Sequence, residues 1–258
     1  MRREIDVKKV IVVLLAFLAV FGIGCASKKE ILKKETQKEE EIKLFPKKVG
    51  SRGTLFTFTD VFLTNVYVIN GKKNVYIIDT YLGPDVMKSV NKYIAQNFGK
   101  KPVIVINTHH HWDHVWGNSV YASNTIIAHE LCVKNMKETG EKVLKEQGHY
   151  QIGKVKLTYP NVTFDNRLHF EEDEILIYHT PGHTDDSISV IDLHDKVLYA
   201  GDNIEDPTPT VEKKDADQYI QTLEEYLKLD VDYVIGGHSN CEDKKIIISN
   251  LEYARTLK

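Results

Sequence analysis

The stretch His109-His110-His111-Trp112-Asp113-His114 follows closely after Val103-Ile104-Val105-Ile106, an apolar run that is typical of a buried strand. Imidazole nitrogens and carboxylate oxygens are among the ligands that zinc prefers in proteins. So many of these groups within one loop would repel one another, or lose hydration at a cost, unless a cation compensated them. The stretch therefore predicts that the end of this strand carries most of a metal centre.

Four further motifs stand at the ends of expected strands: Ile78-Asp79-Thr80, Thr180-Pro181-Gly182-His183-Thr184, Ala200-Gly201-Asp202 and Gly236-Gly237-His238. Glycine beside the histidine or aspartate permits a tight turn and a close approach of the backbone, so that these side chains can be aimed at one point. In an extended loop, residues two apart point the same way. His109 and His111 could therefore share an ion, while His114 would be turned toward another.

Taken together, these motifs resemble the metallo-β-lactamase superfamily from about Leu55 to the C-terminus. The resemblance implies an α+β fold, a four-layer αββα sandwich of two mixed β-sheets with external helices. It implies two divalent metal ions at one edge, with zinc (Zn2+) expected and iron or manganese as alternatives. Carried over residue by residue, it assigns one metal to His109, His111 and His183, the second to Asp113, His114 and His238, and a bridging position to Asp202. Asp79 is expected to accept a hydrogen bond from the histidine loop.

The periodicity of apolar residues from Ser51 onward is consistent with two such sheets, because short strands alternate with helices in both halves of the chain. Strands are predicted at 55–62, 66–69, 74–79, 103–106, 125–128, 155–159, 167–170, 174–179, 187–192, 196–200 and 233–235. Helices are predicted over 85–98, 130–144, 217–229 and 245–257.

The N-terminus has the pattern of an export signal. Basic residues precede an uncharged stretch from Val10 to Gly24, which predicts a signal peptide over residues 1–24. The sequence Gly22-Ile23-Gly24-Cys25 resembles the lipobox of bacterial lipoproteins and predicts lipidation of Cys25. An uncleaved anchor helix and a simple cleaved signal are the alternatives. All three predict export to the periplasm or cell surface, and the first two predict attachment to the membrane.

The segment from Cys25 to residue 49 is rich in lysine and glutamate and is predicted to combine the lipidation site with a charged tether, because it has few apolar residues to bury. The hydrolase domain is then expected over residues 50–258. Cys132 and Cys241 are expected to be free thiols, with a disulfide between them as the alternative. The formal net charge of -3 offers no surplus for a phosphate backbone, so no nucleic-acid partner is expected.

The predicted activity is hydrolysis of a small molecule, an ester, thioester or lactone, by a water that bridges two metal ions. Asp113 is expected to be catalytic as well as a ligand, because its second oxygen could take a proton from that water. The resemblance places a cysteine at the position of Asp202 in one subclass of β-lactamases and no ligand there in another. This difference favours the other hydrolases, but β-lactam hydrolysis is retained as an alternative because an exported location suits a β-lactamase. An iron-dependent sulfur dioxygenase and a non-catalytic binding lipoprotein are the remaining alternatives. The loops 56–65 and 205–217 are expected to select the substrate.

Overall fold

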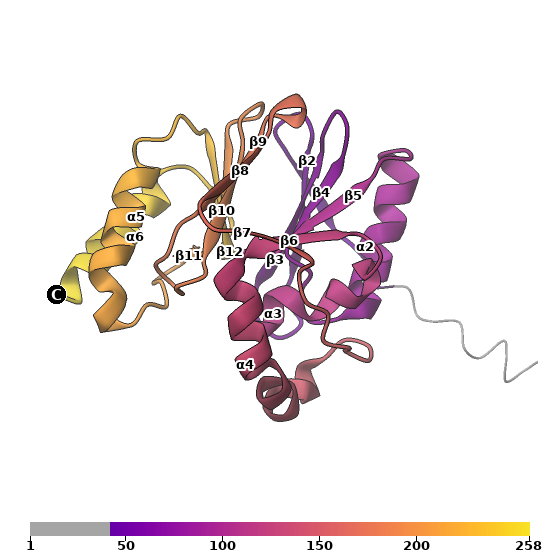
Figure 1. The fold of residues 1–258 in the computed structure, drawn as a ribbon. Helices are drawn as coiled ribbons and strands as arrows, with labels where there is room; N and C mark the ends of the chain where they lie inside the picture. Colours follow the sequence, from indigo (N-terminus) through magenta and orange to yellow (C-terminus); the bar gives the residue numbers. More distant parts are fainter. Residues whose placement is uncertain (1–41) are drawn as a thin grey trace, which may run out of the picture. The chain divides into compact units, whose positions relative to one another are not determined.

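The computed structural model describes residues 42–258, in which two β-sheets lie face to face between outer helices (Figure 1). The predicted signal peptide, Cys25 and most of the predicted tether lie outside the described residues. None of the helices in residues 42–258 combines the length and the apolar character needed to cross a membrane. Cys132 and Cys241 are free thiols.

The first sheet has seven strands in sequence order, antiparallel from β1 to β4 and parallel from β4 to β7. Its strands are β1 (Pro46–Val49), β2 (Gly53–Phe58), β3 (Thr64–Asn70), β4 (Val75–Ile78), β5 (Val103–Ile106), β6 (Thr125–His129) and β7 (Val162–Phe164). The second sheet has six strands in the order β13-β12-β11-β10-β9-β8, and only β11 and β12 are parallel. Its strands are β8 (Arg167–Phe170), β9 (Ile175–His179), β10 (Ile188–Asp192), β11 (Val197–Glu205), β12 (Tyr233–His238) and β13 (Cys241–Glu242).

Helices cover the outer face of each sheet (Figure 1). On the first sheet these are α2 (Pro84–Asn97), α3 (Trp112–Val115) and α4 (Glu130–Gln147), and on the second α5 (Ala216–Tyr226) and α6 (Lys245–Thr256). Short 3-10 helices are η1 (Trp116–Tyr121), η2 (Gly148–Tyr150), η3 (Glu171–Asp173) and η4 (Lys213–Asp215). The αββα sandwich that the resemblance implied is thus confirmed.

The alternation of side chains along each strand builds the layers. In β3, Tyr67 and Ile69 point into the core between the sheets, whereas Val66 and Val68 pack in the core beneath α2. The ring of Tyr67 stacks on Tyr199 of the other sheet, with centroids 6.0 Å apart. Both faces of β3 are apolar because both are covered, which is the pattern of a strand inside a layered fold.

One predicted domain boundary and one predicted strand were wrong. Strand β1 lies at Pro46–Val49, inside the segment assigned to the tether, and pairs with β2. Its two lysines are exposed and only Val49 is buried, as is usual for an edge strand. A strand with so few apolar residues cannot be recognised from its composition. Residues 155–159 were predicted as a strand but are irregular. Val155 and Leu157 satisfy the apolar pattern by packing in the cluster that includes Met136 of α4.

A buried carboxylate ties the two halves together. Asp173 of η3 accepts hydrogen bonds from the Lys73 amide (2.6 Å), the Asn74 side chain (2.8 Å) and the Tyr76 hydroxyl (2.8 Å), all from the turn and strand that follow β3. Burial alone would raise the pKa of Asp173, but these hydrogen bonds outweigh burial and hold the pKa below its ordinary value. A lowered carboxyl pKa stabilises the fold above the pKa of the unfolded chain, and that contribution is lost as the pH falls through the folded-state pKa.

We therefore expect Asp173→Ala to lower the free energy of unfolding by about 2 kcal/mol at neutral pH, because buried donors lose their acceptor. Urea denaturation measures the change. The neighbouring Glu172 is 70% exposed in its side chain, so Glu172→Ala is the matched control and should change the value by less than about 0.5 kcal/mol. Equal losses in the two variants would contradict this role of Asp173.

Candidate metal centre

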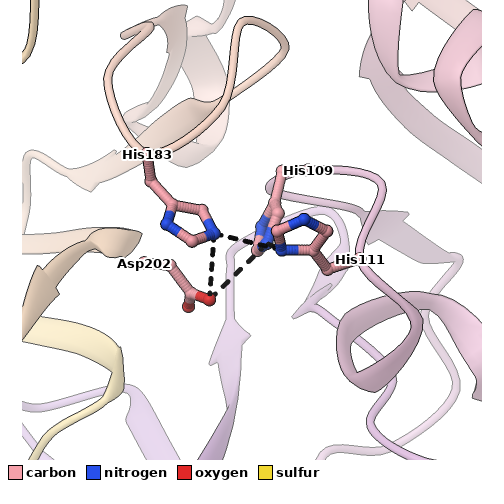
Figure 2. A group of neighbouring side chains, drawn as sticks. All are labelled: His109, His111, His183 and Asp202. Atoms are coloured by element: carbon pink, nitrogen blue, oxygen red, sulfur yellow. Dashed lines mark hydrogen bonds and ion pairs between the residues drawn. The ribbon is translucent and has the colours of Figure 1, made fainter. Parts of the chain in front are cut away.

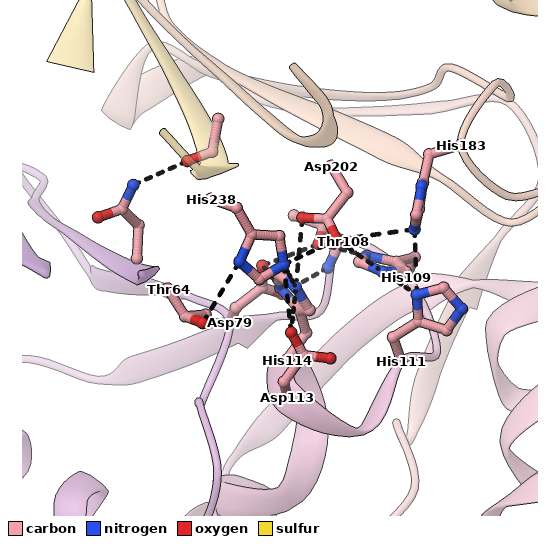
Figure 3. Close-up of polar contacts among 12 residues, drawn as sticks. Thr64, Asp79, Thr108, His109, His111, Asp113, His114, His183, Asp202 and His238 are labelled. Atoms are coloured by element: carbon pink, nitrogen blue, oxygen red, sulfur yellow. Dashed lines mark hydrogen bonds and ion pairs between the residues drawn. The ribbon is translucent and has the colours of Figure 1, made fainter. Parts of the chain in front are cut away.

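The seven side chains predicted as metal ligands converge in two neighbouring groups (Figures 2 and 3). Each residue offers one potential ligand atom, and within a group these atoms all lie within 4.8 Å of one another. The first group contains His109, His111, His183 and Asp202, and the second contains Asp113, His114 and His238. The six residues other than Asp202 divide between the groups as the resemblance implied, and Asp202, which was expected to bridge, is counted with the first group.

The first group joins the two sheets. His109 and His111 follow β5, His183 lies in the loop after β9, and Asp202 lies in β11. The Nδ1 atom of His111 is 2.9 Å from His109 Nε2 and 3.0 Å from His183 Nε2. Asp202 Oδ2 is 3.5 Å from His109 Nε2 and 3.6 Å from His183 Nε2. Three ring nitrogens and one carboxylate oxygen thus face a common centre.

The second group is equally close. Asp113 Oδ2 lies 3.3 Å from His114 Nε2 and 3.2 Å from His238 Nε2, and the two imidazole nitrogens are 3.3 Å apart. Asp202 touches this group too, because its Oδ1 is 3.3 Å from His114 Nε2 and its Oδ2 is 3.1 Å from His238 Nε2. Asp202 therefore lies between the two groups (Figure 3).

The local backbone separates neighbouring residues of the histidine loop. His111 has extended dihedral angles and stands just before α3, which begins at Trp112. An extended loop was expected here, whereas Asp113 and His114 lie in this helical turn. Successive helical residues are rotated by roughly 100° about the axis, so the turn directs Asp113 and His114 away from the first group and into the second.

The outer nitrogens of four imidazoles contact oxygen atoms outside the two groups. These pairs are His114 Nδ1 with Asp79 Oδ2 (2.8 Å), His183 Nδ1 with the Thr210 carbonyl (2.6 Å), His238 Nδ1 with the Leu63 carbonyl (2.6 Å) and His109 Nδ1 with Thr108 Oγ1 (3.1 Å). Carbonyl and carboxylate oxygens only accept hydrogen bonds, so the outer nitrogens carry the protons. Thr108 donates its own hydroxyl proton to Asp79 at 2.8 Å and can accept from His109. Each Nε2 is left to face the centre.

The inward atoms are therefore all acceptors, unless a proton or a cation lies between them. Ring nitrogens 2.9 to 3.3 Å apart repel one another when both present lone pairs. In the part of the chain that the structure describes, Asp202 Oδ1 is one of the few buried side-chain atoms without a hydrogen-bond partner. Such a buried atom is costly unless a positive charge compensates it. The donor set thus fits divalent metal ions in both groups.

The raised pKa values of His114 and His238 also indicate that positive charge is favourable at the second group. Burial would lower the pKa of His238, but Asp202 and Asp113 outweigh burial and raise it to about 10. Burial also opposes charge on His114, and here too the carboxylates of Asp202 and Asp113 raise the pKa well above its ordinary value. Burial instead lowers the pKa of His111 to about 4. Without a metal, protons on His114 and His238 balance the carboxylates, and a cation that binds there must displace them.

Gly237 makes the close approach possible. A Cβ atom at this position would lie 1.9 Å from Asp202 Oδ1 and 2.9 Å from His114 Cε1. Any side chain at position 237 would therefore push Asp202 out of its place between the two groups. The glycine before His238 thus acts on a neighbouring ligand as well as on the turn.

Some contacts could not be inferred from residue types. The backbone carbonyls of Leu63 and Thr210 orient His238 and His183, and every residue has such a carbonyl. Both belong to the loops that were expected to select substrate. His110, the remaining histidine of the stretch 109–114, belongs to neither group and instead pairs with Asp186 at 2.8 Å.

A family model described as the metallo-beta-lactamase superfamily matches residues 59–238. The metallo-beta-lactamase type 2 of Elizabethkingia meningoseptica is 27% identical over 210 residues, which cover 76% of this chain and 77% of that protein. The protein of the same name from Bacillus sp. (strain 170) is 24% identical over 195 residues, covering 73% and 72%. Among solved structures, a metallo-beta-lactamase from Pontibacter korlensis has a TM-score of 0.68 at 19% identity, covering 83% of this chain and 99% of that one. The DIM-1 metallo-beta-lactamase also has a TM-score of 0.68, covering 84% and 99% at 19% identity.

Substitution of Asp79 tests metal binding by the second group, because this residue is fully buried and accepts a hydrogen bond from the outer nitrogen of His114. We expect Asp79→Asn to weaken the binding of one zinc ion by about 10- to 100-fold, since an amide no longer fixes the ring as a carboxylate does. The other zinc ion should lose less affinity, because Asp79 reaches the first group only through Thr108, which contacts His109. Stepwise zinc titration of the metal-free protein against a colorimetric indicator measures both affinities. Asp165→Asn, at a side chain that is 84% exposed, is the control. Unchanged binding of both ions in Asp79→Asn would contradict the assignment.

Proposed function

The chain belongs to the metallo-β-lactamase superfamily of metal-dependent hydrolases, and we propose that it binds two metal ions, zinc being the expected metal, and hydrolyses a carboxylic ester, thioester or lactone. The observation that carries the proposal is the position of Asp202. Its Oδ1 lies 3.3 Å from His114 of the second group, and its Oδ2 lies between the groups, 3.1 Å from His238 and 3.5 Å from His109. One carboxylate within reach of both groups is suited to hold two cations side by side.

Two divalent ions supply the chemistry of hydrolysis, because they lower the pKa of water toward neutrality and stabilise the negative charge that develops on a carbonyl oxygen. The residues of the chain then have distinct tasks. The five imidazoles and two carboxylates fix the positions of the ions, and Asp79, Leu63 and Thr210 fix the imidazole orientations.

Asp113 is the residue that we propose moves the proton. Burial would raise its pKa, but His114 and His238 outweigh burial and hold the pKa of this carboxyl well below its ordinary value, so it is ionised at neutral pH. Its short contacts with both imidazoles use Oδ2. Oδ1 is then the oxygen that accepts a proton from the attacking water and passes it to the leaving group.

The surroundings of the site support a small-molecule substrate. An open pocket of about 660 Å³ lies beside His183 and is lined in part by Thr210, Val211 and Glu212 from the loop 205–217. On the other side, Phe62 from the loop 56–65 contacts His238, with ring centroids 5.2 Å apart. Both loops that were expected to select the substrate thus border the metal-binding residues.

β-Lactam hydrolysis is the second candidate, and the names of the relatives favour it. Against it stands Asp202, at a position where the superfamily resemblance places cysteine, or no ligand, in β-lactamases. An iron-dependent sulfur dioxygenase needs a single metal, and the convergence of His114 and His238 beside Asp113 supports two. A purely binding role is disfavoured because every one of the seven expected ligands is present.

A substrate panel tests the proposal: a homoserine lactone, an acyl thioester, nitrocefin and bis-nitrophenyl phosphate, each assayed with zinc-loaded protein of measured metal content. We expect turnover of the lactone or the thioester, with a kcat/KM at least about tenfold above that for nitrocefin, because 1.4 kcal/mol of transition-state preference suffices for this ratio. A preference for nitrocefin would favour the second candidate. Inactivity on all four substrates with two metal ions bound would contradict the hydrolase.

Asp113→Asn serves as the active-site variant in the same panel. It should lower kcat by about 10²- to 10⁴-fold, since an amide cannot accept the proton. Asp230→Asn, at an exposed residue paired with Lys196, should retain full activity. Undiminished turnover by Asp113→Asn at equal metal content would remove the assignment of Asp113.

A further inference from the structure

A second, apolar pocket adjoins the metal-binding residues and is not used by the mechanism above. It has a volume of about 170 Å³ and lies between α3 and α4, with His111 in its wall. Apart from His110 and His111, the described residues that line it carry no ionisable side chain; the apolar ones are Trp112, Val115, Trp116, Met136, Val143 and Leu157. An anionic group would find no counter-charge there, whereas an apolar group would leave water for an apolar surface.

The walls of this pocket are part of the core. Trp116, Met136 and Val115 are at most 4% exposed, and all three belong to one buried cluster. The ring centroids of Trp112 and Trp116 lie 4.9 Å apart, and the ring of Tyr150 stacks on Trp112 with centroids 5.6 Å apart. Packed side chains in such a cluster have little freedom to collapse, so the space is preserved.

Gly140 keeps one side of the pocket open. It stands in the middle of α4, where glycine is among the poorest helix formers. A Cβ atom there would point at Leu157, 3.4 Å from its Cδ1, in ordinary contact. The backbone thus tolerates a side chain at position 140, and a large one would extend into the space between α4 and Leu157.

Resting on the function proposed above, we propose that this pocket receives the apolar acyl group of the substrate, which makes the preferred substrates esters or thioesters of apolar acids with about four to six carbons. The size supports this range, since a cavity of about 150 Å³ lined by apolar side chains holds one benzene molecule. The position supports it too. His111 contributes to both the pocket wall and the first metal-binding group, so an acyl chain whose carbonyl carbon is at the metal centre lies next to a residue of the pocket wall.

The first test measures kcat/KM of the zinc-loaded full chain for p-nitrophenyl acetate, butanoate and hexanoate. We expect about a tenfold or larger rise from acetate to hexanoate, since each buried methylene favours binding by up to about fourfold. Gly140→Leu should reduce the hexanoate-to-acetate ratio to about twofold or less, and Gly140→Ala should reduce it in part. Glu141→Leu adds the same side chain at the adjacent, exposed position and should keep the wild-type ratio.

The second test needs neither metal nor turnover. Trp112 and Trp116 are the only two tryptophans of the chain and both line the pocket, so tryptophan fluorescence reports its occupancy. Bromobenzene, an apolar quencher of matching size, should quench wild type and Glu141→Leu in a saturable way. Gly140→Leu should require about tenfold more quencher, because its side chain fills the space.

The outcomes separate the two proposals. Quenching that is linear and equal in all variants would overturn the pocket as a binding site. Hydrolysis with no dependence on acyl length would overturn the acyl assignment and leave the hydrolase standing. Saturable quenching without hydrolysis of these esters or of any substrate in the panel above, at full metal content, would overturn the hydrolase, and the assignment of the pocket to a substrate would fall with it.

Discussion

The close approach of inward-facing acceptors is the constraint on which the rest of the structure depends. Five ring nitrogens and the oxygens of Asp113 and Asp202 are gathered within a few ångströms, and only positive charge makes that gathering favourable. Three strands bring these residues together: β5 leads into the histidine loop, β11 contains Asp202 and β12 ends at His238. Gly237 has no Cβ atom, and this absence allows β12 to approach Asp202 closely.

Asp79 combines two unfavourable features that this arrangement requires, a left-handed backbone conformation and a buried carboxylate. It has φ of 63°, a left-handed conformation that few residues other than glycine adopt, and its carboxylate is completely buried. Burial raises its pKa even though His114 and Thr108 act in the opposite direction. The hydrogen bonds to the Thr108 amide and to His114, both 2.8 Å long, hold it in this conformation. A strained, buried carboxylate is tolerated because it positions two neighbouring segments of the metal centre at once.

The layers and the seven converging side chains could be predicted because the order and residue types of the motifs resemble a known superfamily, and the apolar periodicity agreed with its two sheets. His183 and His238 were recognisable from the glycine before each of them. The contacts made by the backbone were not predictable: the carbonyls of Leu63 and Thr210 act through their position alone. Strand β1 escaped detection because an exposed edge strand needs few apolar residues. The acyl pocket depends on the packing of α4 against Leu157, which tertiary structure alone determines.

Anomalous diffraction at the zinc absorption edge, from crystals of the zinc-loaded protein, tests the central claim most directly. The account predicts two zinc peaks at bonding distance, about 2.0 to 2.2 Å from their ligand atoms. One peak should be bound by His109, His111 and His183 and the other by Asp113, His114 and His238, with Asp202 in contact with both. A single peak, or zinc bound elsewhere while these side chains keep their positions, would contradict the account.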